Sequence, residues 1–141
     1  ATQAGLAFSN ASVCLVHGMS RPIGAFFHVP HGLSNAMLLP AVTAFSIEAA
    51  PARYADCARF MGVATEQDSD QIANEKLLQE LRQLNADLAV PTPKAYGIDQ
   101  KRYFELLPIM AEQAQASGSP SNNPRVPTIE EMIALYQEIW E

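Results

Sequence analysis

The sequence predicts an all-α fold, a helical bundle of roughly six to eight helices. Two observations support this fold class. Apolar residues recur at helical spacing along most of the chain, and no segment alternates apolar and polar residues as a half-buried strand does. Ten prolines against seven glycines divide the pattern into several short elements rather than one long rod.

The first predicted helix runs from Thr2 to about Arg21 and is rich in alanine and other small residues. Small residues let helices approach closely, and Leu6 and His17 fall on related faces, so we expect a buried central helix. Pro22 disfavours helical geometry at the residue before it, which predicts that this helix ends at Arg21.

Prolines also mark the next elements. Pro30 can open a second helix, because its missing N–H donor costs nothing in the first turn. That helix should continue through Leu38, with a break or kink near Pro40. Pro51 predicts the start of a further short helix, which Gly62 should stop.

The second half of the chain continues the helical pattern. Helices are expected after Asp99 and again after Pro108, and Thr128 with Glu131 forms a capping box for a last helix. An earlier helix, between Ser69 and Leu88, carries an apolar stripe opposite charged residues. The stripe consists of Ile72, Leu77, Leu78, Leu81, Leu84 and Leu88.

The charge and hydropathy of the chain argue against two kinds of partner. Nine basic residues against fifteen acidic ones give a net charge of −6, which leaves no basic face for nucleic acid. The longest apolar stretch, residues 36–45, is too short to span a bilayer and contains Pro40. We therefore expect neither nucleic-acid binding nor a membrane partner.

The two cysteines, Cys14 and Cys57, lie in apolar sequence surroundings and form no metal-type pair. We interpret them as buried free thiols in a reducing cytosol, with a disulfide as the alternative. The start of the chain also lacks the pattern of a signal peptide. The sequence therefore favours a cytoplasmic protein.

All three histidines, His17, His28 and His31, fall within fifteen residues. Imidazole is a good ligand for iron or zinc, and two imidazoles from separate helices can converge on one ion. A turn that contains proline and glycine separates His17 from His31 and can fold both side chains toward one point. The pair is thus a candidate for part of a metal site, although two histidines alone do not define one.

The segment around these histidines resembles the signature of the iron-containing (group III) alcohol dehydrogenases. The fourteen-residue spacing between His17 and His31 matches that between two metal ligands of this family, and the likeness extends over nearly the whole chain. The matching motif elements are His17-Gly18-Met19, Gly24, Phe26-Phe27, Pro30-His31-Gly32 and Asn35.

This resemblance implies a dehydroquinate-synthase-like fold of two domains, in which an N-terminal α/β domain binds NAD(P) and a helical domain follows. Residues 1–141 would be the C-terminal, metal-binding helical domain, with the N-terminal domain absent. The family's ion, Fe²⁺ or sometimes Zn²⁺, has one Asp and three His ligands, of which His17 and His31 would be two. No segment here matches the other two ligands, so we expect the chain alone to be inactive.

The implied activity is metal-assisted hydride transfer between NAD(P) and a small alcohol, aldehyde or ketone. Phe8, Phe26 and Phe27 are candidates for the wall of the substrate pocket, with core packing as the alternative for each. A helical domain without its partner domain should also expose an apolar face, which favours self-association as a homo-oligomer.

Two residues near the site depart from the family pattern. Four residues after the first ligand many relatives carry a second histidine, thought to relay the alcohol proton, but this chain has Arg21, which cannot accept a proton. His28 is a candidate for that relay, with a surface position as the alternative. Arg21 can pair with a carboxylate and so favour a hydroxy acid, or it can tie down a helix end or an acidic group between domains.

Two other functions remain open from the sequence. One is a zinc enzyme similar to glycerol dehydrogenase, within the same superfamily. The other is a helical interaction module without catalytic activity, for which neither His17 nor His31 would matter.

Overall fold

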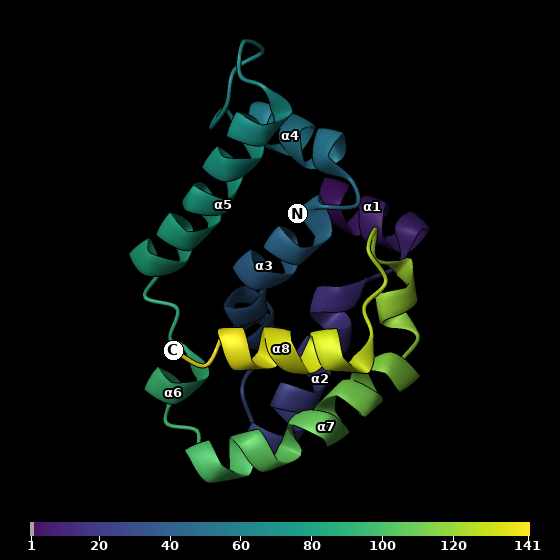
Figure 1. Cartoon of the computed structure of the whole chain (residues 1–141), viewed down its shortest axis with the longest axis vertical. Coiled ribbons are helices and arrows are strands. Elements are labelled where there is room, and N and C mark those ends of the chain that lie inside the picture. The colour runs from purple at the N-terminus through teal and green to yellow at the C-terminus, as the bar shows by residue number, and fades with distance from the viewer. Residues whose placement is uncertain (1) are drawn as a thin grey trace.

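The computed structural model describes residues 2–141, and every regular element in that range is a helix. Figure 1 shows how the eight α-helices are arranged. They are α1 (Thr2–Ala11), α2 (Leu15–Phe27), α3 (His31–Ile47), α4 (Pro51–Phe60), α5 (Asp70–Asp87), α6 (Pro93–Tyr96), α7 (Gln100–Ala116) and α8 (Ile129–Glu138), with a short 3₁₀ helix, η1 (Ser119–Asn122), before α8. The all-α prediction and its number of helices are confirmed.

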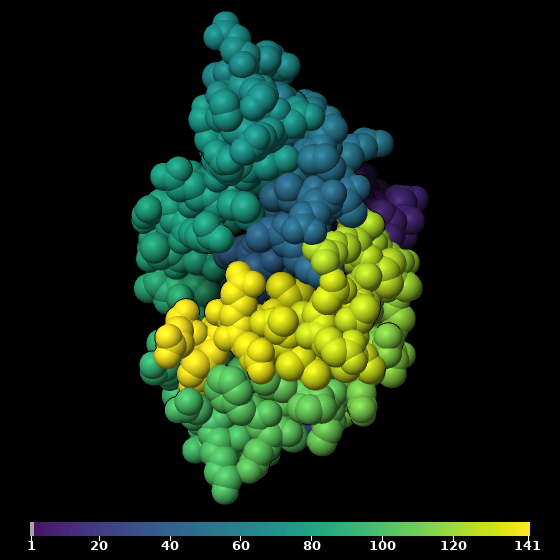
Figure 2. Space-filling model, in the orientation of Figure 1, coloured from purple at the N-terminus to yellow at the C-terminus, as the bar shows by residue number. Residues whose placement is uncertain are grey.

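Helix α2 lies at the centre of the main core, where it packs against α3, α7 and η1. Helix α8 crosses in front of it in Figure 1 and contributes the buried side chains of Met132 and Tyr136 to the same core. Helices α4 and α5 form a hairpin with a smaller cluster of its own, which includes Ala55, Ala58 and Leu77. Figure 2 shows the far end of this hairpin projecting beyond the rest of the molecule.

The single helix expected from Thr2 to Arg21 is wrong. The structure has two helices there, separated at Ser12, whose positive φ of 63° places it in the left-handed region that no α-helix continues through. Helix α1 has no buried residue, so the small side chains of the segment mark a buried helix only in α2.

Helix α2 also continues past Arg21, although Pro22 lacks the N–H that would pair with the carbonyl of Gly18. The buried hydroxyl of Tyr136 donates to the carbonyl oxygen of the next residue, Met19, at 2.7 Å and so anchors this turn to α8. Pro22 itself is buried, and burial of Met19 and Ile23 on the same helix favours continuing the α2 geometry.

Helix α3 is likewise unbroken at Pro40, where the sequence predicted a break or kink. The missing N–H of Pro40 would have paired with the carbonyl of Ala36, four residues earlier. The side-chain amide of Asn85 on α5 donates to that carbonyl at 2.8 Å instead. A side chain 49 positions away therefore satisfies the acceptor that the proline leaves free.

The remaining predictions for single elements are mixed. The capping box at Thr128 and Glu131 is confirmed. The prediction that a new helix starts after Pro108 is wrong, because α7 runs through this proline without interruption. The α5 stripe is buried at its centre, but Leu88 is 67% exposed beyond the end of the helix.

The cysteines are both free, as expected, but Cys57 is exposed rather than buried. Cys14 is partly buried at the start of α2. Within residues 2–141, no helix combines the length and the apolar character needed to cross a bilayer.

Candidate metal centre

The turn between α2 and α3 brings the two ends of the histidine motif together. Helix α2 ends at His28, whose backbone has φ 57° and ψ 27° and whose N–H donates to the carbonyl of Gly24 at 3.0 Å. The chain then passes through buried Val29 to Pro30, which precedes the first residue of α3, His31. A Cβ atom at Gly24 would lie 3.2 Å from the carbonyl oxygen of Val29, so the glycine permits this tight return.

The rings of His17 and His31 lie close together and tilted against each other across the two helices. Their centroids are 5.3 Å apart, and their planes are inclined by 56°. Two imidazoles that bind one tetrahedral ion, each at about 2.0–2.1 Å, have ring centres about 5 Å apart. The separation and the donor chemistry of the pair therefore fit a shared iron or zinc ion.

Polar side chains hold the His31 ring on both of its nitrogens. The hydroxyl oxygen of Ser20 lies 3.3 Å from Nδ1, and the side-chain nitrogen of Asn35 lies 3.2 Å from Nε2. The carbonyl oxygen of the Asn35 side chain is buried and has no hydrogen-bond partner among the described residues. The ring of His31 is therefore fixed from both sides.

The surroundings of His17 favour its neutral form. Burial lowers the pKa of His17 below its usual value, and the neighbouring His31 and Arg21 lower it further. A neutral imidazole keeps a lone pair for a metal ion, because the protonated ring has none to donate.

The histidine pair is an incomplete coordination site. In the part of the chain that the structure describes, no group of three or more His, Cys, Asp or Glu side chains is arranged to hold a metal ion. A catalytic zinc or iron site commonly has at least three protein ligands.

Arg21 lies one helical turn after His17, and its guanidinium donates to the hydroxyl of Ser119 on η1 at 3.5 Å. No carboxylate within residues 2–141 forms a salt bridge with it. Arg21 also lines an open hollow of about 370 Å³ between α2 and α7, with Gln113 on the opposite side. The contact with Ser119 agrees with the role of tying down a helix end, and none of the three histidines lines this hollow.

The other predicted site residues are not brought into one cluster with the histidine pair. His28 is exposed and ends α2. Phe8 is 58% exposed on α1, whereas Phe26 and Phe27 pack partly buried against the main core. The proton-relay role of His28 and the pocket roles of the three phenylalanines stay predictions.

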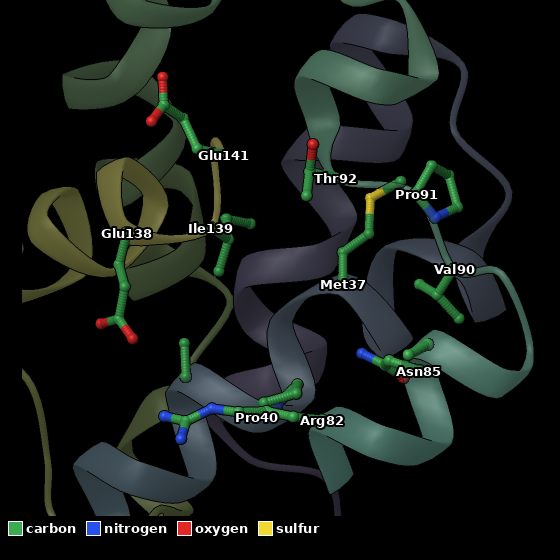
Figure 3. A pocket seen from close by; sticks show the side chains of 12 residues that line it. Met37, Pro40, Arg82, Asn85, Val90, Pro91, Thr92, Glu138, Ile139 and Glu141 are labelled. Atoms are coloured by element: carbon green, nitrogen blue, oxygen red, sulfur yellow. The ribbon is translucent and has the colours of Figure 1, made fainter. Parts of the chain in front are cut away.

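A second hollow, of about 340 Å³, lies away from the histidines between α3, α5 and α8 (Figure 3). Met37, Val90 and Ile139 give it an apolar lining, and Arg82 and Glu138 stand at its border. None of the three histidines lines it, so it is not part of the candidate metal centre.

Gly18, next to His17, allows α2 to pack directly on η1. An added Cβ atom would lie 2.9 Å from Cδ and 3.0 Å from Cγ of the Pro120 ring. We therefore expect Gly18→Ala to lower the free energy of unfolding by about 1–3 kcal/mol, measured by urea denaturation. Gly5→Ala on α1 is the matched control, since nothing lies within 4 Å of its Cβ position and alanine favours a helix by about 0.5–1 kcal/mol. Equal stability of the two variants would contradict the tight contact.

Sequence reasoning missed Ser20 as a residue of this site. Ser20 lies three residues after His17 on the same helix, and this spacing explains only the hydrogen bond of 3.1 Å from its hydroxyl to the His17 backbone carbonyl. The contact with the His31 ring crosses from one helix to the next and depends on the turn at His28. Spacing along one helix carries no signal for such a contact.

Comparison with known proteins identifies the family of this chain. The sequence profile of the iron-containing alcohol dehydrogenase family, C-terminal part, matches residues 1–140. The chain belongs to this family. Lactaldehyde reductase from Escherichia coli strain K12 is 36% identical over 97% of this chain, and the NADPH-dependent butanol dehydrogenase from Clostridium saccharobutylicum is 31% identical over 97%.

A solved family member has the same fold. The structure of an alcohol dehydrogenase from Oenococcus oeni superimposes with a TM-score of 0.87 at 35% identity, covering 97% of this chain and 35% of its own. Each of the two curated relatives is likewise matched over 35% of its length. The chain therefore spans about a third of the length of these iron-containing alcohol dehydrogenases.

Proposed function

We propose that this chain is the C-terminal, metal-binding part of an NAD(P)-dependent alcohol dehydrogenase that interconverts a small alcohol with its aldehyde or ketone. The observation that carries this proposal is the convergence of the His17 and His31 rings at 5.3 Å. Fe²⁺ or Zn²⁺ suits the pair, because imidazole nitrogen binds both ions.

The two histidines would hold and orient the ion, each through one neutral ring nitrogen. When bound, the ion supplies Lewis-acid polarisation of the substrate oxygen, and a nicotinamide coenzyme supplies or accepts the hydride. The low pKa of His17 keeps that ring available as a ligand at neutral pH. The buried hydroxyl of Ser20 would hold the other ring in place, and the amide of Asn35 holds its second edge when no ion is bound.

The coenzyme would be held mainly outside this chain. One relative, the butanol dehydrogenase, is named as NADPH-dependent, and the chain corresponds to only about a third of it. No glycine-rich phosphate-binding fingerprint occurs in the 141 residues. The nicotinamide would therefore approach the histidine pair from a neighbouring domain of the longer protein.

Arg21 favours a substrate that carries a carboxylate. Its guanidinium has no salt-bridge partner in the described part of the chain, and Arg21 follows His17 by one helical turn. A fixed cation there can hold a carboxylate through charge-assisted hydrogen bonds while the hydroxyl of the same molecule reaches the metal. We propose a hydroxy acid or its oxo acid as the preferred substrate on this basis.

The activity can be tested with the purified full-length protein. We expect reduction of NAD⁺ or NADP⁺ with a small alcohol or hydroxy acid, loss of this rate after chelation, and recovery on addition of Fe²⁺ or Zn²⁺. A protein that binds a divalent ion at the histidine pair yet transfers no hydride with any alcohol or hydroxy acid would contradict the proposal.

A further inference from the structure

Ser20 lies fully buried on α2, and its hydroxyl group contacts both candidate ligands. The hydroxyl oxygen is 3.1 Å from the backbone carbonyl oxygen of His17 and 3.3 Å from Nδ1 of the His31 ring. It therefore couples the backbone of the first ligand to the side chain of the second.

The number of protons decides how these two contacts are made. A serine hydroxyl carries one proton, and the carbonyl of His17 can only accept a hydrogen bond. If the hydroxyl donates to that carbonyl, its contact with His31 is a hydrogen bond only when Nδ1 carries the ring proton. Both contacts are satisfied together in this arrangement alone.

The other edge of the ring leads to the same tautomer. The side-chain NH₂ of Asn35 lies 3.2 Å from Nε2 of His31 and donates to it, which requires a lone pair on Nε2. The proton then resides on Nδ1, in agreement with the contact to Ser20. Nε2, which faces Asn35, therefore carries the lone pair that can bind a metal ion in place of the amide.

We propose that Ser20 is a positioning residue for the metal: its hydroxyl oxygen accepts a hydrogen bond from the Nδ1–H of His31 and so leaves the Nε2 lone pair for the ion. The amide of Asn35 occupies the position on Nε2 that the ion takes when it binds. This inference rests on the proposed function, because it assigns His31 as a ligand. A metal-binding histidine commonly donates its second ring N–H to such an acceptor, which fixes its tautomer.

Ser34 provides a matched control. It is as fully buried as Ser20, and its hydroxyl donates to the carbonyl of His31 at 3.0 Å, also three residues earlier in the sequence. No contact joins the hydroxyl of Ser34 to either imidazole ring in the described structure. Loss of a buried serine hydroxyl on its own should therefore affect Ser20→Ala and Ser34→Ala in the same way.

The first test is ¹⁵N NMR of histidine side chains in the metal-free, full-length protein, with His31 assigned from His31→Gln. We expect the Nδ1-protonated tautomer in the wild type, in Ser34→Ala and in Asn35→Ala. Because Asn35 favours the same tautomer from the other edge of the ring, we expect its loss when Ser20→Ala is combined with Asn35→Ala. A wild-type His31 protonated on Nε2 would overturn the proposal, whether or not any variant folds. Retention of the Nδ1 tautomer in the double variant would also overturn it.

The second test measures the affinity of the same proteins for Zn²⁺. Ser20→Ala should weaken binding by roughly 10–100-fold, and Ser34→Ala should leave it unchanged. Equal weakening by both variants would show a merely structural role for Ser20. A wild type that has the expected tautomer but binds no Zn²⁺ would refute the proposed function, and the positioning role with it.

Discussion

His17→Ala and His31→Ala should each remove the bound metal and lower kcat/KM of the full-length enzyme by about 10³-fold or more. Lewis-acid stabilisation by a metal is worth several kcal/mol, and about 1.4 kcal/mol corresponds to a factor of ten in rate. Because the rings lie 5.3 Å apart and would share one ion, either loss disables the same site. Metal content by mass spectrometry and steady-state rates check both effects.

A double variant tests whether both histidines bind the same ion. If both histidines bind one ion, His17→Ala with His31→Ala should be little worse than either change alone, because residues that act as a unit are not additive. His28→Asn is the control for metal content, since His28 is exposed and asparagine tolerates its left-handed backbone. Additive losses in the double variant, or full metal content in either single variant, would contradict a shared ion.

Arg21→Gln should lower kcat/KM for a hydroxy acid by about 10–100-fold while leaving the value for an unsubstituted alcohol of similar size nearly unchanged. Charge-assisted hydrogen bonds contribute about 1.5–3 kcal/mol, and glutamine removes the charge but keeps a side chain of similar reach. Steady-state rates with both substrate types measure the change in preference.

Arg82→Gln is the matched control for the loss of a positive charge. Arg82 borders the hollow between α3, α5 and α8, which none of the three histidines lines (Figure 3). It should leave both kcat/KM values as they are. Equal use of the two substrate types by the wild type, unchanged in Arg21→Gln, would remove the carboxylate proposal and leave Arg21 as a tether to Ser119.

Local patterns predicted much of this fold. The capping box at Thr128 and Glu131 is a signal confined to four residues, and it forms as expected. The helix end predicted at Pro22 and the break predicted at Pro40 do not occur, because distant side chains stabilise both helices. The Asn85 amide replaces the hydrogen bond lost at Pro40, and the Tyr136 hydroxyl anchors the turn before Pro22 to α8. Neither contact can be recognised from the sequence around the prolines.

The candidate site likewise combines features that the sequence predicts with contacts that it does not. The spacing of His17 and His31, taken together with the resemblance to the family's motif, predicted that the two rings lie close together, and their centroids are 5.3 Å apart. The contacts of Ser20 and Asn35 with opposite edges of His31 depend on how α3 is rotated against α2. Rotation of one helix about its axis is set by core packing over many residues, so the sequence motif alone does not specify it.

We propose that one divalent ion binds between the imidazoles of His17 and His31 on adjacent helices. An anomalous-diffraction map of the full-length protein, crystallised with Zn²⁺, would locate that ion. We expect one peak about 2.0–2.1 Å from a ring nitrogen of His17 and equally close to Nε2 of His31. A fully loaded crystal whose zinc peaks all lie elsewhere, with the two rings still in contact, would contradict the claim.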